Sequence, residues 1–135
     1  RTEVENVAKF MAPYDQYTYA ALRIVSGLLF AFHGSQKLLS WPVEAMAGMP
    51  ALVTYIQGPI ELIGGALVMM GLMTRWAAFI ASGSMAAAYW VVHGGKALFP
   101  MVNGGELAIM YCFAFLYIAA RGPGIWSIDA MRGQS

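Results

Sequence analysis

Residues 59–93, PIELIGGALVMMGLMTRWAAFIASGSMAAAYWVVH, decide the fold. Apolar stretches lie on each side of the short link MTR at 73–75, one over 52–72 and one over 76–93. Each approaches the roughly 20 residues that a helix needs to cross the ~30 Å hydrocarbon core of a bilayer. So short a link requires the two helices to run antiparallel. The stretch therefore predicts a hairpin of membrane-spanning helices, with Thr74 as a cap of the second helix.

The composition of the whole chain also indicates a membrane protein. Of the 135 residues, 59% are hydrophobic and 11% are charged, and the mean hydropathy is +0.59. Soluble domains carry about 25% charged residues, so a soluble bundle of this composition would lack polar surface. The net charge of +1 and the absence of a basic cluster argue against nucleic acid as a partner. A single cysteine, Cys112, excludes an internal disulfide.

The same criteria of length and hydropathy identify further spans on either side of the hairpin. Together the predicted spans are about 19–39, 52–72, 76–93 and 105–120. We therefore predict an all-α membrane protein with four transmembrane helices in an antiparallel bundle. The bundle occupies 18–121, an N-terminal arm 1–17, and an interfacial C-terminal tail 122–135.

Basic residues are distributed unevenly between the two faces of such a bundle. The face of the N-terminal arm and the C-terminal tail holds Arg1, Lys9, Arg23, Arg75, Arg121 and Arg132. The opposite face holds only Lys37 and Lys96. Because cytoplasmic segments carry the excess of Lys and Arg, both termini are expected in the cytoplasm.

Each predicted helix carries polar and aromatic residues spaced three and four apart, which places them on one face. The four sets are Arg23, Ser26, Phe30, His33 and Lys37; Gln57, Glu61, Gly64 and Val68; Ser82, Met85, Tyr89 and His93; and Glu106, Met110, Phe113, Tyr117 and Arg121. Lipid cannot solvate polar groups, so we expect all four faces to point into the bundle. Gly64 and Gly65 are expected to allow close helix packing.

Depth along the helices gathers part of these sets into one polar cluster. His33, Lys37, Gln57, His93 and Glu106 fall in the outer half of the bundle, and Glu61 falls near its middle. A carboxylate at mid-membrane costs about 2.5–3.5 kcal/mol and needs a partner or a proton. Such a cluster is either a ligand site or a link between helices, and Lys37 can pair with Glu61 or with Glu106.

Candidate site residues follow from this cluster. We take Glu61, His33 and Lys37 as candidate catalytic residues. The candidate ligand-pocket residues are Gln57, Tyr89, Trp90, His93 and Glu106. No metal site is predicted, because His33 and His93 lie at different depths for one haem iron and no other set has ligand spacing.

Four motifs in order, LRIVSGLLFAFHGSQKL, PIELIGGALVMMGLMTRWAA, NGGELAIMY and GPGIWSID, resemble the DoxX family of small membrane proteins. The resemblance covers nearly all of 22–129. The family pattern falls on His33, Gly34, Lys37, Glu61, Gly64, Gly65, Gly71, Thr74, Arg75, Asn103, Gly104, Gly105, Glu106, Gly122, Pro123, Gly124, Ser127 and Asp129. It implies a bacterial inner-membrane protein with four helices. It also implies a link to redox complexes, as in subunits of thiosulfate:quinone oxidoreductases or complexes that join oxidative-stress enzymes.

Three functions stay open from the residues and the resemblance. In the first, His33 and Glu61 exchange protons with a bound quinone and Lys37 stabilises negative charge, within a quinone- or thiol-linked redox complex. The chain encodes no flavin or nicotinamide fingerprint and no cofactor of its own, so electrons would come from another subunit and the chain is at most a non-autonomous part of an oxidoreductase. The alternatives are a purely structural accessory subunit and a small transporter or lipid-handling protein. The expected partners are membrane lipids and other subunits of a membrane complex.

Overall fold

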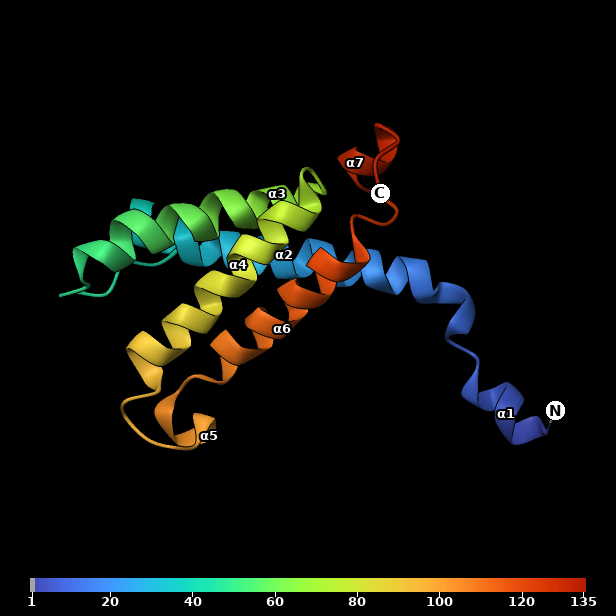
Figure 1. The fold of residues 1–135 in the computed structure, drawn as a ribbon, viewed down its shortest axis with the longest axis horizontal. Helices are drawn as coiled ribbons and strands as arrows, with labels where there is room; N and C mark the ends of the chain where they lie inside the picture. Colours follow the sequence, from blue (N-terminus) through green and yellow to red (C-terminus); the bar gives the residue numbers. More distant parts are fainter. Residues whose placement is uncertain (1) are drawn as a thin grey trace.

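A computed structural model describes residues 2–135, and every regular element in that range is helical (Figure 1). Arg1, counted above among the basic residues, lies outside the described residues. In chain order the elements are α1 Glu3–Ala8, η1 Ala12–Tyr14, α2 Asp15–Leu39, η2 Val53–Gln57, η3 Ile60–Gly64, α3 Gly65–Met70, α4 Thr74–Ala88, η4 Tyr89–His93, α5 Pro100–Asn103, α6 Glu106–Arg121 and α7 Ile128–Met131. The predicted all-helical class is confirmed.

The long helices differ in how well each alone meets the requirements of a membrane crossing. Among residues 2–135, one helix is long and apolar enough by itself: Val53–Met70, with a mean hydropathy of 1.3 over 18 residues. The α6 helix has 16 residues. The α2 helix is longer, but it carries Arg23, His33 and Lys37 among its apolar residues.

The long helices form two antiparallel pairs, α2 with η3 and α3, and α4 with α6. The pairs meet where α3 turns into α4 and where α6 ends, and they diverge toward the other end, as Figure 1 shows. We call the meeting region, residues 68–75 and 118–131, the closed end. The region of η2, η4 and α5, residues 51–57 and 89–105, is the open end.

Glycines bring the first helix pair into backbone contact. A Cβ atom on Gly27 would lie 2.6 Å from the Gly65 carbonyl oxygen, and a Cβ atom on Gly34 would lie 2.7 Å from the Gly58 carbonyl oxygen. Only residues without side chains allow two helices to approach so closely. Gly65 therefore has the predicted packing role, whereas the same expectation for Gly64 is wrong because Gly64 faces open space.

An aromatic cluster joins α2 to the second helix pair. The Phe30 ring lies 4.7 Å from the Phe115 ring and 5.3 Å from the Tyr111 ring, measured between centroids. Tyr111 and Phe115 stack on each other one turn apart on α6. All three side chains are buried, so this cluster forms the apolar contact between the pairs.

A buried arginine holds the closed end. The Arg23 side chain on α2 is fully buried. Its Nε donates to the Val68 carbonyl at 3.1 Å, and its guanidinium nitrogens donate to the carbonyls of Pro123, Ile125 and Trp126. Arg23 thus ties α2 to the end of α3 and to the turn that follows α6.

Asp129 caps α4 from the far end of the chain. Its carboxylate accepts hydrogen bonds from the Met73 backbone N–H at 3.1 Å, the Thr74 N–H at 3.0 Å and the Thr74 hydroxyl at 2.8 Å. Burial acts to raise the pKa of the Asp129 carboxyl, but the hydrogen bonds from Thr74 and Met73 outweigh it, and the pKa lies below its usual value. The prediction of Thr74 as the cap is wrong: Met73 is the N-cap residue, without a side-chain cap of its own.

The predicted face of the fourth helix points the wrong way. Met110, Phe113 and Tyr117 are 68%, 63% and 51% exposed, so this face of α6 is turned outward. The inward face is instead made of Ala108, Tyr111, Phe115 and Ile118. Only the two ends of the outward face, Glu106 and Arg121, are charged, and the methionine and aromatic residues between them are as compatible with lipid as with a protein core. The expected inward orientation of this face is therefore incorrect.

Candidate functional site

An ion pair between α2 and η3 is the centre of the candidate site. The Lys37 ammonium lies 2.7 Å from the Glu61 carboxylate, and the two side chains are 13% and 4% exposed. Lys37 could pair with Glu61 or Glu106, and the structure selects Glu61. In a low-dielectric region a charge pair at this distance compensates much of the cost of burying either charge.

A hydrogen-bond chain extends this pair to α4. The Gln57 amide donates to the second oxygen of Glu61 at 3.3 Å and lies 3.2 Å from the Ser84 hydroxyl. Ser84 in turn donates to the Ala81 carbonyl at 2.8 Å. Both carboxylate oxygens of Glu61 are therefore engaged. Sequence reasoning missed Ser84, because it lies off the α4 face that Ser82 defines.

His33 lies one turn before Lys37 on α2, with its ring edge toward Tyr111. The two ring centroids are 6.0 Å apart and the ring planes meet at 86°. Every fully buried side-chain nitrogen or oxygen among residues 2–135 has a hydrogen-bond partner. The His33 imidazole and the Tyr111 hydroxyl have no hydrogen-bond partner among residues 2–135. They are therefore not fully buried, and their polar atoms are accessible to a ligand or to water. Tyr111 was not predicted, since it follows Met110 in an apolar stretch.

Two other predicted pocket residues belong to a separate group near α5. His93 Nδ1 lies 3.0 Å from the Asn103 carbonyl oxygen, and the Asn103 side chain donates to the Tyr89 hydroxyl at 3.1 Å. Asn103 also donates to Ala97 and accepts from Gly105. These bonds fix the loop between α4 and α6. They do not connect Tyr89 or His93 to Glu61.

The last two predicted pocket residues lie outside both groups. Trp90 is 73% exposed, and Glu106 is exposed at the start of α6. Together with Tyr89, Met85, Ile109 and Phe113, Trp90 lines a groove of about 360 Å³ between α4 and α6. No residue of α2 or η3 lines this groove. The single predicted pocket is thus divided into the group around Glu61 and an apolar groove on the other helix pair.

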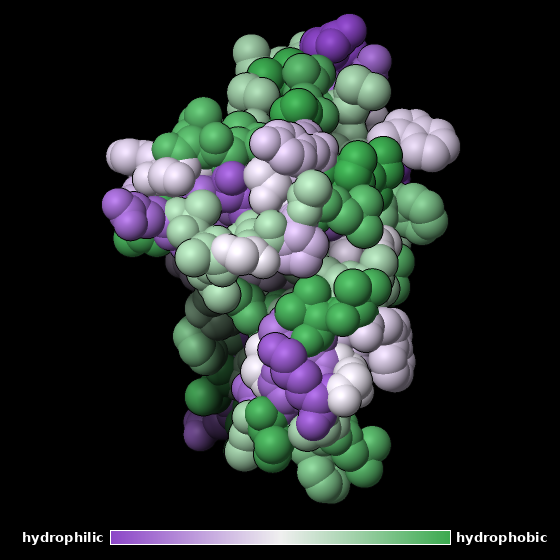
Figure 2. Space-filling model, turned by 90° about the vertical axis from the view of Figure 1, so that its left-hand side faces the viewer, coloured by the Kyte–Doolittle hydropathy of each residue, from purple (hydrophilic) through white to green (hydrophobic). Residues whose placement is uncertain are grey.

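The surface of the open end is largely apolar. Figure 2 faces this end and shows hydrophobic residues over much of it, with small hydrophilic patches between them. Large exposed apolar residues there include Tyr55, Ile56, Trp90, Val91, Leu98 and Met101. Exposed apolar area of this extent marks contact with lipid or with another protein.

The class of protein follows from these features. Every regular element among the described residues is helical, the buried charges are paired or hydrogen-bonded, and many large apolar residues are exposed. Those are the properties of a helical membrane protein. The chain belongs to the DoxX family, whose family profile matches residues 18–94. The resemblance found in the motifs is therefore confirmed.

Comparison with individual proteins gives three relatives. An uncharacterised protein of Haemophilus influenzae is 41% identical over 122 residues, which cover 86% of this chain and 91% of that protein. A Bacillus subtilis protein named provisionally as the oxidoreductase CatD is 27% identical, over 80% of this chain and 81% of its own. An uncharacterised membrane protein of Mycobacterium tuberculosis is 25% identical over 126 residues, which cover 80% of this chain and 77% of that protein. No solved structure matches the chain significantly.

Proposed function

We propose that this chain is a four-pass subunit of a bacterial inner-membrane complex, with both termini in the cytoplasm and the closed end at the cytoplasmic face. Two observations support this orientation. Arg23, Arg75, Arg121 and Arg132 all lie at or beside the closed end, whereas Lys37, next to Gly58, and Lys96 lie toward the open end. The excess of arginine is characteristic of the cytoplasmic side.

We further propose that the Glu61 group binds the head group of a quinone in the outer half of the membrane. The observation that carries this proposal is a buried carboxylate held by two polar side chains, with a histidine one helical turn from its lysine partner and a tyrosine against that histidine. Lys37 and Gln57 hold Glu61 from both sides, while His33 and Tyr111 present polar atoms without protein partners next to them. A quinone oxygen accepts hydrogen bonds, which the His33 and Tyr111 groups can donate.

The chemistry assigned to each residue follows from its charge. Reduction of a quinone to a quinol takes up electrons and protons in equal number, and the electrons come from a partner subunit. His33 passes one of the two protons to a ring oxygen, because imidazole exchanges protons near neutral pH. Water reprotonates His33 and supplies the second proton. The Lys37 ammonium stabilises negative charge on that oxygen, and Glu61 fixes the position of Lys37. The Bacillus subtilis relative is named as an oxidoreductase, and that name supports a redox role.

The test uses a matched pair of glutamate variants. The full chain is purified with its native lipids, its bound quinone is extracted and identified, and binding of decylubiquinone is then titrated by tryptophan fluorescence. Glu61→Gln is expected to weaken binding about tenfold, the effect of losing one charged hydrogen-bonding group. Glu106→Gln removes an exposed charge outside the group and should leave binding unchanged. A wild-type chain that carries no quinone and binds none would refute the ligand site.

A purely structural subunit is the second candidate, and one observation favours it. Both oxygens of Glu61 already have protein partners from α2 and η2, so the pair needs no ligand to be stable. In that case Glu61→Gln would disturb assembly with partner subunits, measured by native electrophoresis of the solubilised complex. Normal assembly together with lost quinone binding would exclude the structural interpretation.

A further inference from the structure

A cavity lies at the closed end, between the start of α2, the end of α6 and the tail. It measures about 360 Å³, and its lining includes Gln16, Tyr19, Arg121, Pro123, Ile125 and Gln134. None of the candidate site residues around Glu61 contributes to it. Most of its wall is apolar, and its one charged lining residue is the guanidinium of Arg121.

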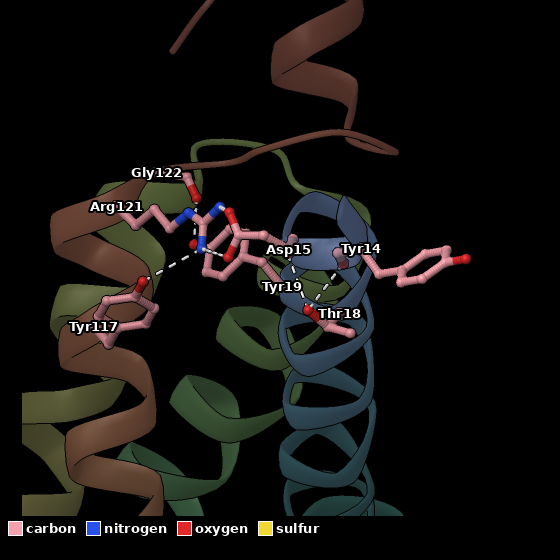
Figure 3. A network of polar contacts seen from close by, with 7 residues as sticks. All are labelled: Tyr14, Asp15, Thr18, Tyr19, Tyr117, Arg121 and Gly122. Carbon is pink, nitrogen blue, oxygen red and sulfur yellow. Dashed lines mark hydrogen bonds and ion pairs between the residues drawn. The ribbon is translucent and has the colours of Figure 1, made fainter. Parts of the chain in front are cut away.

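Arg121 is held at this cavity by a network of contacts, drawn in Figure 3. Its Nη2 donates to the Asp15 carboxylate at 2.9 Å, and its Nη1 donates to the Tyr117 hydroxyl at 3.3 Å. Its guanidinium carbon lies 4.1 Å from the centre of the Tyr19 ring. The side chain stays 30% exposed. Arg121 is therefore fixed in position yet accessible to an anion.

The closed end carries a surplus of positive charge. Arg23 and Arg75 donate to backbone oxygens rather than to side-chain carboxylates, and the acceptors of Arg75 include Ser135, which also lines the cavity. The Asp129 carboxylate is already engaged by Met73 and Thr74. The carboxylates of Asp15 and Asp129 both keep their charge, so two negative charges face four positive ones at or beside this end, those of Arg23, Arg75, Arg121 and Arg132, and the potential around the cavity stays positive.

The outward face of α6 leads from the cavity into the membrane. Tyr117, Phe113 and Met110 follow Arg121 along this face, and all are exposed. At 1.5 Å per residue, Met110 lies about 16 Å from Arg121 along the helix. That length corresponds to about one half of the ~30 Å hydrocarbon core. The stripe therefore matches one acyl chain in one leaflet.

We propose that this cavity binds the headgroup of an anionic phospholipid of the cytoplasmic leaflet. Arg121 contacts the lipid phosphate, in place of or beside Asp15, and one acyl chain lies along Tyr117, Phe113 and Met110. Anionic headgroups at the cytoplasmic leaflet attract basic residues that lie near its surface. The inference rests on the proposed membrane orientation, but it is independent of the quinone site.

The test measures lipid-dependent stability of the full chain. Delipidated protein in a non-ionic detergent is titrated with dioleoyl phosphatidylglycerol, dioleoyl phosphatidylcholine or inorganic phosphate, and thermal unfolding is followed. Phosphatidylglycerol is expected to raise the unfolding temperature at concentrations where the other additives do not. Arg121→Gln should weaken the apparent affinity for phosphatidylglycerol about tenfold. Asp15→Asn should strengthen it, because it removes the competing carboxylate.

The controls separate this site from its alternatives. Lys96→Gln removes a basic residue near the open end and should leave the lipid effect unchanged. An equal effect of phosphatidylcholine would overturn the proposal, and an equal effect of inorganic phosphate would reduce the site to one for free anions. If Arg121→Gln does not fold, Asp15→Asn decides the question: unchanged or weaker binding by that variant overturns the proposal.

Discussion

The closed end and the open end of the bundle differ in whether their polar groups have protein partners. At the closed end, Arg23 and Asp129 find their partners in the backbone of distant segments, and little polar capacity is left over. Toward the open end, His33 and Tyr111 have polar atoms without partners among the described residues, and at the open end itself large apolar residues are exposed. The difference indicates that the helices are fixed from one end, so that the other end is available for a ligand or a partner.

Removal of the buried Arg23 is expected to have the largest effect on the stability of the closed end. Arg23→Leu leaves several buried carbonyl groups without a donor, and we expect a loss of about 3–5 kcal/mol in the free energy of unfolding. Denaturant unfolding in detergent micelles, followed by tryptophan fluorescence, measures it. Arg132→Gln, at an exposed arginine of the same end, serves as the control. Equal stability of the two variants would contradict the assigned role of Arg23.

Asp129→Asn tests the second contact of the closed end. The neutral amide is a weaker acceptor for Thr74 and Met73, so a loss of about 1.5–3 kcal/mol is expected near neutral pH. Because the pKa of Asp129 is lowered by folding, its contribution is complete above the ordinary value of 3.8 and is lost as pH falls below it. Unfolding measured between pH 3 and pH 7 should therefore show this acid-dependent loss in the wild type. The variant should lack that component.

Two adjacent glycines test the contact between α2 and α3. A Cβ atom on Gly65 would lie 2.5 Å from the Ala31 backbone nitrogen, so Gly65→Ala is expected to cost about 1–3 kcal/mol. Gly64→Ala meets no atom within 4 Å and should be neutral or stabilise the helix by up to about 1 kcal/mol. Chemical unfolding of both variants checks the difference. A destabilising Gly64→Ala would show that this face is covered.

The smallest expected effect on stability is at Tyr111, and the same substitution at Tyr19 makes the comparison. Tyr111→Phe removes a hydroxyl without a protein partner and should change the free energy of unfolding by no more than about 0.5 kcal/mol. Tyr19→Phe removes a hydroxyl that donates to the Gly122 carbonyl and should cost about 1 kcal/mol. In decylubiquinone titrations, only Tyr111→Phe should weaken binding. Unchanged binding would remove Tyr111 from the proposed site.

Helix periodicity predicted the part of the site that lies on single helix faces. The spacing of Arg23, His33 and Lys37 on α2, and of Gln57 and Glu61 on the next helix, correctly indicated inward faces. The same reasoning failed for α6, where aromatic and other apolar residues occur on both faces. Periodicity identifies an inward face only when polarity differs between the two sides of a helix.

Helix periodicity could not predict the contacts between segments that are far apart in the sequence. Arg23 and Pro123 are separated by 100 residues, and Thr74 and Asp129 by 55. Both contacts depend on how the chain turns after α6, which no local pattern specifies. The division of the predicted pocket has a similar cause, because the divergence of the two helix pairs is set by packing at the closed end.

The acceptors of Arg23 have a consequence for biosynthesis. In the proposed four-pass topology, α2 enters the membrane during translation before the carbonyls of Pro123, Ile125 and Trp126 have been made. The arginine must therefore stay near the headgroups or pair transiently until roughly a hundred further residues have been added. Completion of the bundle is thus a late event, and a chain stopped at Arg121 should be degraded faster in a pulse-chase experiment than one that continues through α7. Equal lifetimes would contradict this order of assembly.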